Sequence, residues 1–304
     1  MKKFFMAVIA IMMTVSVSAQ FYIYLSNGEV LQADSISMVA PSTPTPPTPG
    51  MLSGEFSVSA KKKVHFSQGN LQYQASTQTW RFAENQYDMI GNANSNISAS
   101  YSGWIDWFGG GTGNNPTNSS TNYHDYSTFV EWGVNAISNG GNEANLWYTL
   151  SKDEWVYLFN IRTNAASLFG LGSVNGINGI IILPDSWVTP DGASFTPSTT
   201  QGLADQGGNY YNSKGDNFSH NTYTAEQWSV MESAGAVFLP AAGYRDSMGA
   251  NDVGADGQYW SSTPEGEYGA YLLSFNANSF YPRNSAFRNN GLSVRLVQDI
   301  TTKL

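Results

Sequence analysis

QYWSS (258–262), AYLLSF (270–275) and LSVRLV (292–297) are three segments near the C-terminus that decide the fold class. Each is rich in aromatic or aliphatic residues, and stretches containing Gly, Asn, Ser or Pro separate them, which is typical of β-strands and their connections. A fourth segment of this kind, AVFL (236–239), precedes them. The last third of the chain is therefore predicted to form a sheet, with Leu292–Val297 as a paired central strand.

Two helices are predicted because two capping boxes occur upstream of these strands. SKDE (151–154) and TAEQ (224–227) each place a hydroxyl residue three positions before Glu or Gln, so that both ends of the box can bind backbone N–H groups. Apolar residues follow each box at helical spacing, and we expect Trp155 and Trp228 to be buried. Gly235 is placed to end the second helix in a left-handed conformation.

The first part of the same domain alternates at period two and then becomes rich in loop residues. FSVSA (56–60) and VHF (64–66) lie on either side of Lys61–Lys63, which indicates a hairpin with a charged tip. Long Gly/Asn/Ser-rich stretches follow at 91–123 and 198–222. The pattern predicts an α+β domain with a modest sheet, two helices and long loops.

The N-terminal 50 residues divide into three predicted parts. Residues 1–19 are predicted to be a signal peptide, because two lysines precede a short apolar run and small residues end it. Residues 20–39 hold two apolar runs around Asn27-Gly28 and are expected to form a short β-ribbon. Residues 40–50, APSTPTPPTPG, are typical of a Pro-rich linker. Because no second linker appears, residues 51–299 are predicted to be one domain.

The charge balance excludes some partners. The formal net charge is -9 and the pI about 4.7, and an acidic surface of this kind disfavours nucleic acid and anionic membranes. No apolar run after residue 20 is long enough to span a membrane, so no membrane span is expected once the signal peptide is removed. With the predicted signal peptide, these features indicate an exported protein that is periplasmic, displayed at the cell surface or secreted.

Four motifs then carry a resemblance to a known family. They occur in the order EANLWYTLSKDEWVYLF (143–159), VFLPAAGYR (237–245), YWSST (259–263) and GLSVRLV (291–297). Together they resemble the Fibrobacter succinogenes major paralogous domain, which is also common in gut Bacteroidetes. That group is similar to the C-type-lectin-like folds of formylglycine-generating (sulfatase-modifying) enzymes and of variable proteins of diversity-generating retroelements. The resemblance implies a C-type-lectin-like domain with a small twisted antiparallel sheet, two helices and long loops.

No catalytic residue or cofactor is predicted. Formylglycine-generating enzymes act through cysteines that bind copper, and this chain has no cysteine. The three histidines, His65, His124 and His220, are far apart in sequence and none has a second His or Cys at metal-ligand spacing. Sequence alone does not decide whether carboxylates converge as a glycosidase-type pair. A loop calcium also stays open as an alternative, with candidate ligands at Asp246, Asp252 and Asp256, although the twelfth position of an EF-hand loop is Thr rather than an acid.

The candidate ligand-binding site is the stretch between Phe275 and Gly291, NANSFYPRNSAFRNN. Asn and Ser adapt their hydrogen bonds, and Tyr and Phe give large contact areas at low entropic cost, as in other binding loops. The stretch lacks Lys, Glu, Gln, Met and Trp, which is compatible with retroelement diversification of asparagine codons. The predicted recognition residues are Asn276, Asn278, Tyr281, Arg283, Asn284, Phe287, Arg288 and Asn289, with Trp260 and Tyr244 beside them.

Arg295 is assigned instead to the interior of the closing strand. The function expected from these features is binding of an unknown protein or glycan ligand for adhesion or recognition, and a retroelement-diversified variable protein is one form of it. The alternative is a periplasmic or secreted enzyme on a sulfatase-modifying-factor-like fold, without the cysteine and copper chemistry. A structural surface protein with no small ligand is a third possibility.

Overall fold

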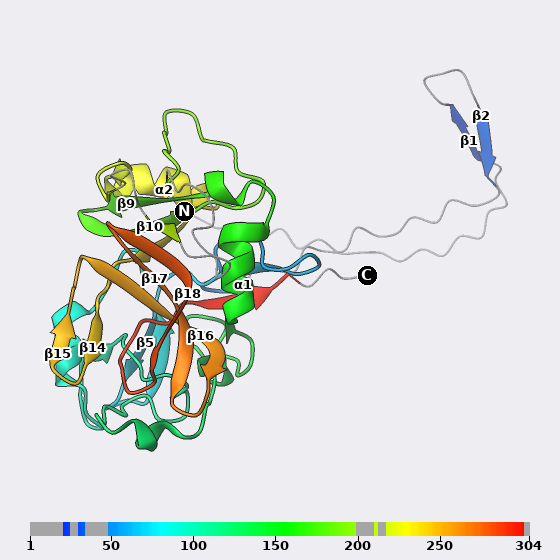
Figure 1. Cartoon of the computed structure of the whole chain (residues 1–304). Coiled ribbons are helices and arrows are strands. Elements are labelled where there is room, and N and C mark those ends of the chain that lie inside the picture. Colours follow the sequence, from blue (N-terminus) through cyan, green and yellow to red (C-terminus); the bar gives the residue numbers. More distant parts are fainter. Residues whose placement is uncertain (1–20, 25–29, 34–47, 199–209, 212–216, 301–304) are drawn as a thin grey trace, which may run out of the picture. The chain divides into compact units, whose positions relative to one another are not determined.

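The computed structural model describes residues 21–24, 30–33, 48–198, 210–211 and 217–300 (Figure 1). The chain divides into two compact units, Met1–Pro46 and Pro47–Leu304, and each is described by itself. The predicted signal peptide and most of the predicted linker lie outside the described residues. No helix in the part of the chain that is described is long and apolar enough to cross a membrane.

The first unit contains a two-stranded ribbon. Strands β1 (Phe21–Tyr24) and β2 (Val30–Ala33) pair antiparallel, with Phe21 opposite Ala33 and Tyr24 opposite Val30. The two strands lie on either side of Asn27-Gly28, the position at which the sequence predicts the turn of a hairpin.

The second unit holds its strands in several small sheets. One sheet has the order β3 (Phe56–Ser57), β4 (Lys63–Phe66), β19 (Leu296–Asp299), β8 (Tyr148–Thr149). A second has the order β12 (Thr222–Tyr223), β9 (Phe169–Val174), β10 (Ile177–Ile182), β13 (Val237–Pro240). A third has the order β11 (Tyr210–Tyr211), β18 (Ser279–Phe287), β17 (Gly269–Asn276), β16 (Asp256–Glu265). Smaller sheets join β6 (Thr79–Phe82), β5 (Leu71–Gln74) and β7 (Trp104–Ile105), and β14 (Tyr244–Asp246) with β15 (Gly249–Asn251).

The helices are short and few. They are α1 (Lys152–Val156), which continues as the π-helical segment η4 (Tyr157–Ile161), and α2 (Ala225–Ser233). Short 3-10 segments are η1 (Gly91–Asn96), η2 (Tyr123–Tyr126), η3 (Trp132–Val134) and η5 (Ala165–Ser167). The second unit is therefore α+β, as predicted, although its strands form several small sheets. Among the described strands, pairing is antiparallel except between β12 and β9, which are parallel.

Both predicted capping boxes form. Ser151 and Glu154 exchange side-chain-to-backbone hydrogen bonds at the start of α1, and Thr224 and Gln227 do the same at the start of α2. Gly235 follows α2 with a φ of +98°, a conformation that residues with a side chain rarely adopt. The first helix is shorter than the apolar pattern indicates, because its second half changes to π-helical hydrogen bonding.

Three buried apolar clusters fill the second unit. Trp155, on α1, lies in the first of them with residues of β4, β10 and β17, and Trp228, on α2, lies in the third with residues of β10 and β13. Both tryptophans are buried, as predicted. The second cluster joins β5 and β6 to Trp260 and Val294. Aromatic rings in these clusters meet edge to face, as Phe82 and Trp147 do, or stacked, as Trp155 and Phe159 do, and they supply much of the packing in a chain without cysteine.

The closing segment only partly matches its prediction. Val294 and Leu296 are fully buried, but the regular strand β19 begins at Leu296 rather than Leu292. Before it, Leu292 and Ser293 form single bridges to Phe108 and Tyr259. Leu292 and Ser293 thus bridge to other segments before the chain joins a sheet at Leu296. The predicted strand Leu292–Val297 therefore does not form one continuous β-ladder.

Arg295 is buried in the same segment. Its guanidinium donates hydrogen bonds to the backbone carbonyls of Ser67, at 3.0 Å, and Phe238, at 2.5 Å. With a third bond, to the Gln86 carbonyl at 3.4 Å, Arg295 thus joins carbonyl groups of three different segments in the interior, where the sequence analysis places it.

Candidate recognition surface

Four ring-bearing side chains gather at one end of the β17–β18 hairpin, and we call them the aromatic patch: Tyr123, His124, Tyr268 and Phe287. The Phe287 ring stacks on Tyr123 with centroids 5.8 Å apart, and Tyr123 meets Tyr268 edge to face at 4.8 Å. His124 packs against both tyrosines. Phe287 is 62% exposed and Tyr123 is 39% exposed, so the patch presents apolar surface to solvent.

Strand pairing places two members of the patch next to each other. Gly269 begins β17 and pairs with Phe287 at the end of β18, so Tyr268, which precedes Gly269, reaches the same end of the hairpin. The other two members come from η2, whose first turn is capped by the Asn122 side chain. The patch therefore joins segments that are more than 140 residues apart in sequence.

A buried arginine holds these segments together. Arg288 is 2% exposed and donates hydrogen bonds to the carbonyl oxygens of Gly110, at 2.8 Å, and Thr128, at 2.5 Å. Its backbone N–H donates to the Tyr268 carbonyl at 2.8 Å. Next to it, Asn289 donates to the Thr121 carbonyl at 2.9 Å. These bonds connect β18 to the two segments that carry the rest of the patch.

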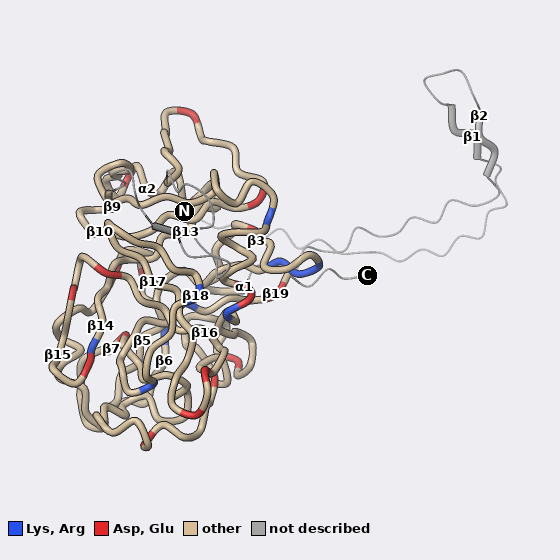
Figure 2. Tube along the Cα trace, in the orientation of Figure 1, with Lys and Arg blue, Asp and Glu red and all other residues tan. Residues whose placement is uncertain are grey.

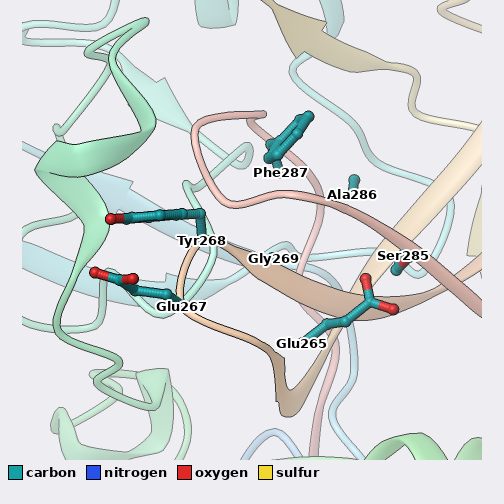
Figure 3. A pocket seen from close by; sticks show the side chains of 7 residues that line it. All are labelled: Glu265, Glu267, Tyr268, Gly269, Ser285, Ala286 and Phe287. Atoms are coloured by element: carbon teal, nitrogen blue, oxygen red, sulfur yellow. The ribbon is translucent and has the colours of Figure 1, made fainter.

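A pocket of about 400 Å³ opens beside the patch (Figure 3). It is lined by Glu265, Glu267, Tyr268, Gly269, Ser285, Ala286 and Phe287. Glu267 and Tyr268 extend side by side on one flank, and the Glu265 carboxylate points toward Ser285 on the other. Gly269 lies between these flanks, and a Cβ atom there would sit 3.3 Å from the Glu265 carboxylate, so the absence of a side chain keeps this space open.

The pocket is acidic in a chain with few charges. Figure 2 shows that Lys, Arg, Asp and Glu are sparse along the trace, yet two of the seven lining residues are glutamates and none is Lys, Arg or His. A hydrogen bond to the Glu267 carboxylate raises the pKa of the Tyr268 phenol. With its proton donated to Glu267, the Tyr268 oxygen can accept one from His124 Nδ1, which lies 3.1 Å away.

The structure divides the predicted recognition residues between two ends of one strand. Residues 279–287, predicted to be a loop, form strand β18, because Phe280 and Pro282 are buried and Phe280 packs on Phe159. At about 3.3 Å per residue, Asn278 and Phe287 lie about 30 Å apart, so they do not share one binding face. Arg283, Asn284 and Asn289 lie toward the Phe287 end of the segment.

Two of the predicted recognition residues, Trp260 and Arg288, are buried, so the prediction that they are exposed is wrong. Trp260 is fully buried in the core, and its indole N–H donates to the Phe108 carbonyl at 2.7 Å. Arg288 is the buried clamp described above. Tyr281 and Tyr244 are half-buried. Sequence reasoning missed Tyr123, Tyr268, Glu265 and Glu267, because each is a common surface residue whose neighbours come from distant segments.

At the other end of the hairpin, Asn276 closes the β17–β18 turn. Its side-chain oxygen accepts from the backbone N–H groups of Asn278, at 2.8 Å, and Ser279, at 2.9 Å. A second pocket there is lined by Asp252, Asp256 and several asparagines. Burial raises the pKa of Asp256 to about 6.

The residues considered for calcium are not gathered into one carboxylate cluster. Asp246 accepts the Met248 N–H at 2.7 Å within the β14–β15 turn, and Asp252 hydrogen-bonds the Tyr244 phenol. Within the described ranges, no three or more His, Cys, Asp or Glu side chains are placed to hold a metal ion together.

Two other carboxylates, the buried Asp106 and the half-buried Glu131, accept hydrogen bonds from loop residues. Asp106 accepts hydrogen bonds from the Ile90 N–H, at 2.9 Å, and the Asn94 amide, at 2.7 Å, and burial raises its pKa to about 6. Glu131 accepts from the Thr149 N–H and hydroxyl and from the Gly133 N–H, and burial raises its pKa. Each carboxylate thus connects its own segment to a loop or strand 12 to 18 residues away in sequence.

Comparison with known proteins gives one partial match. Searches of curated proteins and of solved structures found no match. A family model matches residues 209–297, a range that holds Tyr268, Phe287 and both pocket glutamates, whereas Tyr123 and His124 lie outside it. This part of the chain, from β11 to the second residue of β19, is similar to the family described as Domain of unknown function (DUF8237).

Proposed function

We propose that this protein is an exported recognition protein that binds a ligand on the aromatic patch and the acidic pocket beside it. The observation that carries the proposal is the exposure of Phe287 and Tyr123 as stacked neighbours, with Phe287 also lining the pocket. Burial of a Phe or Tyr ring by a ligand is worth about 1.5–3 kcal/mol. Aromatic residues with few rotatable bonds are typical binding anchors.

Hydrogen bonds hold together the segments that carry the aromatic patch. Arg288 and Asn289 connect β18 to the segments on which Tyr123 and His124 lie. Side chains that are held by contacts within the fold lose less conformational freedom when they bind a ligand.

The proposal also includes the export of the protein and a C-type-lectin-like fold for its second unit. The predicted signal peptide at residues 1–19 supports delivery to the periplasm, the cell surface or the medium. The α+β architecture and the four motifs at 143–159, 237–245, 259–263 and 291–297 support a C-type-lectin-like domain of the Fibrobacter succinogenes major paralogous type. In that interpretation, the segments around Tyr123 and Tyr268 belong to the loop-built face on which such domains bind.

The enzyme alternative would place perturbed carboxylates in an open site. Asp106 is fully buried, and both of its oxygens accept hydrogen bonds from neighbouring segments. The Glu131 carboxylate likewise accepts hydrogen bonds within the fold, from the Gly133 N–H at the start of η3 and from the Thr149 N–H. These two roles are structural. Asp256, whose pKa burial raises and which lines the second pocket with Asp252, is the carboxylate that the enzyme alternative would use. The exposed aromatic patch favours the binding function.

The test is binding after truncation of the exposed rings. Tyr123 and Phe287 are replaced together by Ala, with Val188→Ala, at a residue that is 79% exposed, as the matched control. Each mature protein is presented to glycan arrays and to displayed protein libraries, and thermal unfolding is measured in parallel. Ligands selected by the unaltered protein should be lost from the double variant and retained by the control, with unfolding temperatures unchanged. If the double variant still bound every ligand, the aromatic patch would not be part of the binding surface.

A further inference from the structure

We infer that strand β1 of the N-terminal ribbon is a pairing edge for a second copy of this chain, so that the protein dimerises through its first unit. This edge belongs to the ribbon alone, so the inference is independent of the aromatic patch. A dimer of this kind carries two copies of the second unit. Two linked binding domains hold a ligand that is repeated on a surface more tightly than one domain does.

The ribbon has two open backbone edges. β1 and β2 pair with each other, and within the described residues neither strand pairs with a third strand (Figure 1). The other two-stranded sheet, β14–β15, differs, because Gly243 and Arg245 form bridges to segments outside it. The unpaired N–H and C=O groups of an open edge are a template for a further strand.

The strands of the ribbon lack the features that protect an edge. Soluble proteins commonly guard sheet edges with charged side chains, proline or β-bulges. FYIY (21–24) and VLQA (30–33) contain no charged residue and no proline, and their register is continuous over all four pairs. The β3–β4 hairpin, in contrast, has Lys61–Lys63 at its tip, and β4 begins with Lys63. The composition of the ribbon therefore favours pairing over exposure of its edges.

The ribbon is also too small to be stable by itself. The first unit ends at Pro46, so residues 20–46 remain of it once the predicted signal peptide is removed. Chains below about 40 residues rarely fold unaided, and a two-stranded hairpin in water is marginally stable at best. Strand alternation gives the ribbon one face that is apolar throughout, with Phe21, Ile23, Leu31 and Ala33. Pairing with a second ribbon supplies the additional strands that a stable sheet needs.

Charge distinguishes β1 from β2 as the edge that pairs. In sequence, β2 is flanked by Glu29 and Asp34, so two antiparallel copies of β2 would bring acidic residues together. Gln20 and Leu25 flank β1, and neither is charged. Aromatic and β-branched residues, which favour strands, also fill β1, whereas β2 ends in Gln and Ala.

The sequence of β1 is complementary to itself. When two copies meet antiparallel about a two-fold axis at Ile23, Tyr22 stands opposite Tyr24 of the second copy and Ile23 stands opposite itself. Aromatic and β-branched pairs of this kind stabilise antiparallel strands. The same register continues the apolar face across the axis, because odd-numbered residues of both copies fall on one side of the sheet. The order of strands in the dimer is then β2–β1–β1–β2.

The experiment measures self-association of the mature full chain by sedimentation equilibrium over a wide range of protein concentration. One variant carries Tyr22→Lys with Tyr24→Lys, and another carries Tyr22→Glu with Tyr24→Glu. Ser42→Lys with Thr45→Lys, in the Pro-rich segment, is the matched control for the lysine variant, because it adds the same charge outside the strands. Thermal unfolding checks that the second unit, which has its own buried clusters, stays folded in each protein.

The unaltered chain and the control should dimerise with the same dissociation constant. The lysine variant should raise this constant about tenfold or more, because like charges would meet across the axis. The glutamate variant should be weakened in the same way, and a mixture of the two variants should dimerise again, which ribbons unfolded by the substitutions could not do. A monomer at every concentration would overturn the inference and leave the edge to a strand of a different protein. Dimers that the substitutions leave unchanged, or a mixture that fails to recover, would overturn it as well.

Discussion

Gly269 and Phe287 lie opposite each other in the β17–β18 pair, and this one pairing sets an exposed ring beside a space that has no side chain. Tyr268 and Glu267 precede Gly269, so a single turn also supplies the second ring and one of the two carboxylates. The functional surface proposed for this protein therefore depends on the register of one hairpin.

Replacement of Gly269 by Ala should close the pocket. The new Cβ would lie 2.7 Å from the Glu265 carbonyl oxygen and 3.3 Å from its carboxylate, so the turn must shift to admit it. We expect a loss of about 1–3 kcal/mol in the free energy of unfolding, as for other overpacked positions, together with weaker ligand binding. Urea unfolding and titration with a selected ligand measure the two effects. Ser285→Ala, on the facing strand, leaves the backbone in place and should change stability little.

Arg288→Ala should destabilise the protein by about 3 kcal/mol or more, because the carbonyl groups of Gly110 and Thr128 lose a charged donor inside the structure. The η2 segment should loosen as a consequence, since Arg288 and Asn289 hold the chain beside it. Arg283→Ala is the comparison, because Arg283 is exposed on β18, the strand that precedes Arg288, and its loss should change stability by less than about 0.5 kcal/mol. Similar losses for both variants in chemical denaturation would contradict the clamp assigned to Arg288.

Val294→Asp should prevent folding. Val294 is fully buried in the cluster that contains Trp260 and Phe108. A carboxylate without a partner in such a place costs several kcal/mol, which is comparable with the whole stability of a domain. Soluble yield and near-ultraviolet circular dichroism report the outcome. Val294→Ala serves as the milder control and should leave a folded protein that unfolds at lower temperature. A folded aspartate variant would show that the segment around Val294 can leave the core.

Asp106 should make the protein less stable as pH rises from about 4 to 6. Burial raises its pKa to about 6 in the folded state, above the value of about 3.9 for an exposed aspartate. The folded state therefore binds more protons than the unfolded state in this window, and the stabilisation present below pH 4 is lost as pH rises through 6. The free energy of unfolding of Asp106→Asn, compared with the unaltered protein across this window, isolates the effect. The difference should change by about 1–3 kcal/mol, and a constant difference would assign the carboxyl an ordinary pKa.

The two capped helices could be predicted from the sequence because a capping box is a local device. SKDE (151–154) and TAEQ (224–227) satisfy backbone groups within three residues, and both form as the pattern indicates. The same holds for Gly235, whose left-handed conformation depends on the missing side chain alone. Burial of Trp155 and Trp228 follows from helical spacing of apolar residues.

The site could be predicted only in part. Composition pointed to the segment 276–290, and Phe287 is indeed exposed there. Composition could not show that 279–287 is a strand, because the burial of Phe280 and Pro282 depends on packing partners such as Phe159. It could not show that Arg288 faces inward either, since an arginine with only carbonyl partners has no local sequence pattern.

The sequence by itself thus determined the α+β class, the capped helices and the position of a hairpin with exposed polar and aromatic residues. The tertiary structure alone decided which of those residues face solvent and which distant side chains accompany them. Strand register brought Phe287 to Gly269, and the carbonyls of Gly110, Thr121 and Thr128 brought the chain around Tyr123 and His124 to the same place. The physical reason is range: caps and periodicity act over three or four residues, whereas a surface patch is assembled by hydrogen bonds and packing between segments more than a hundred residues apart.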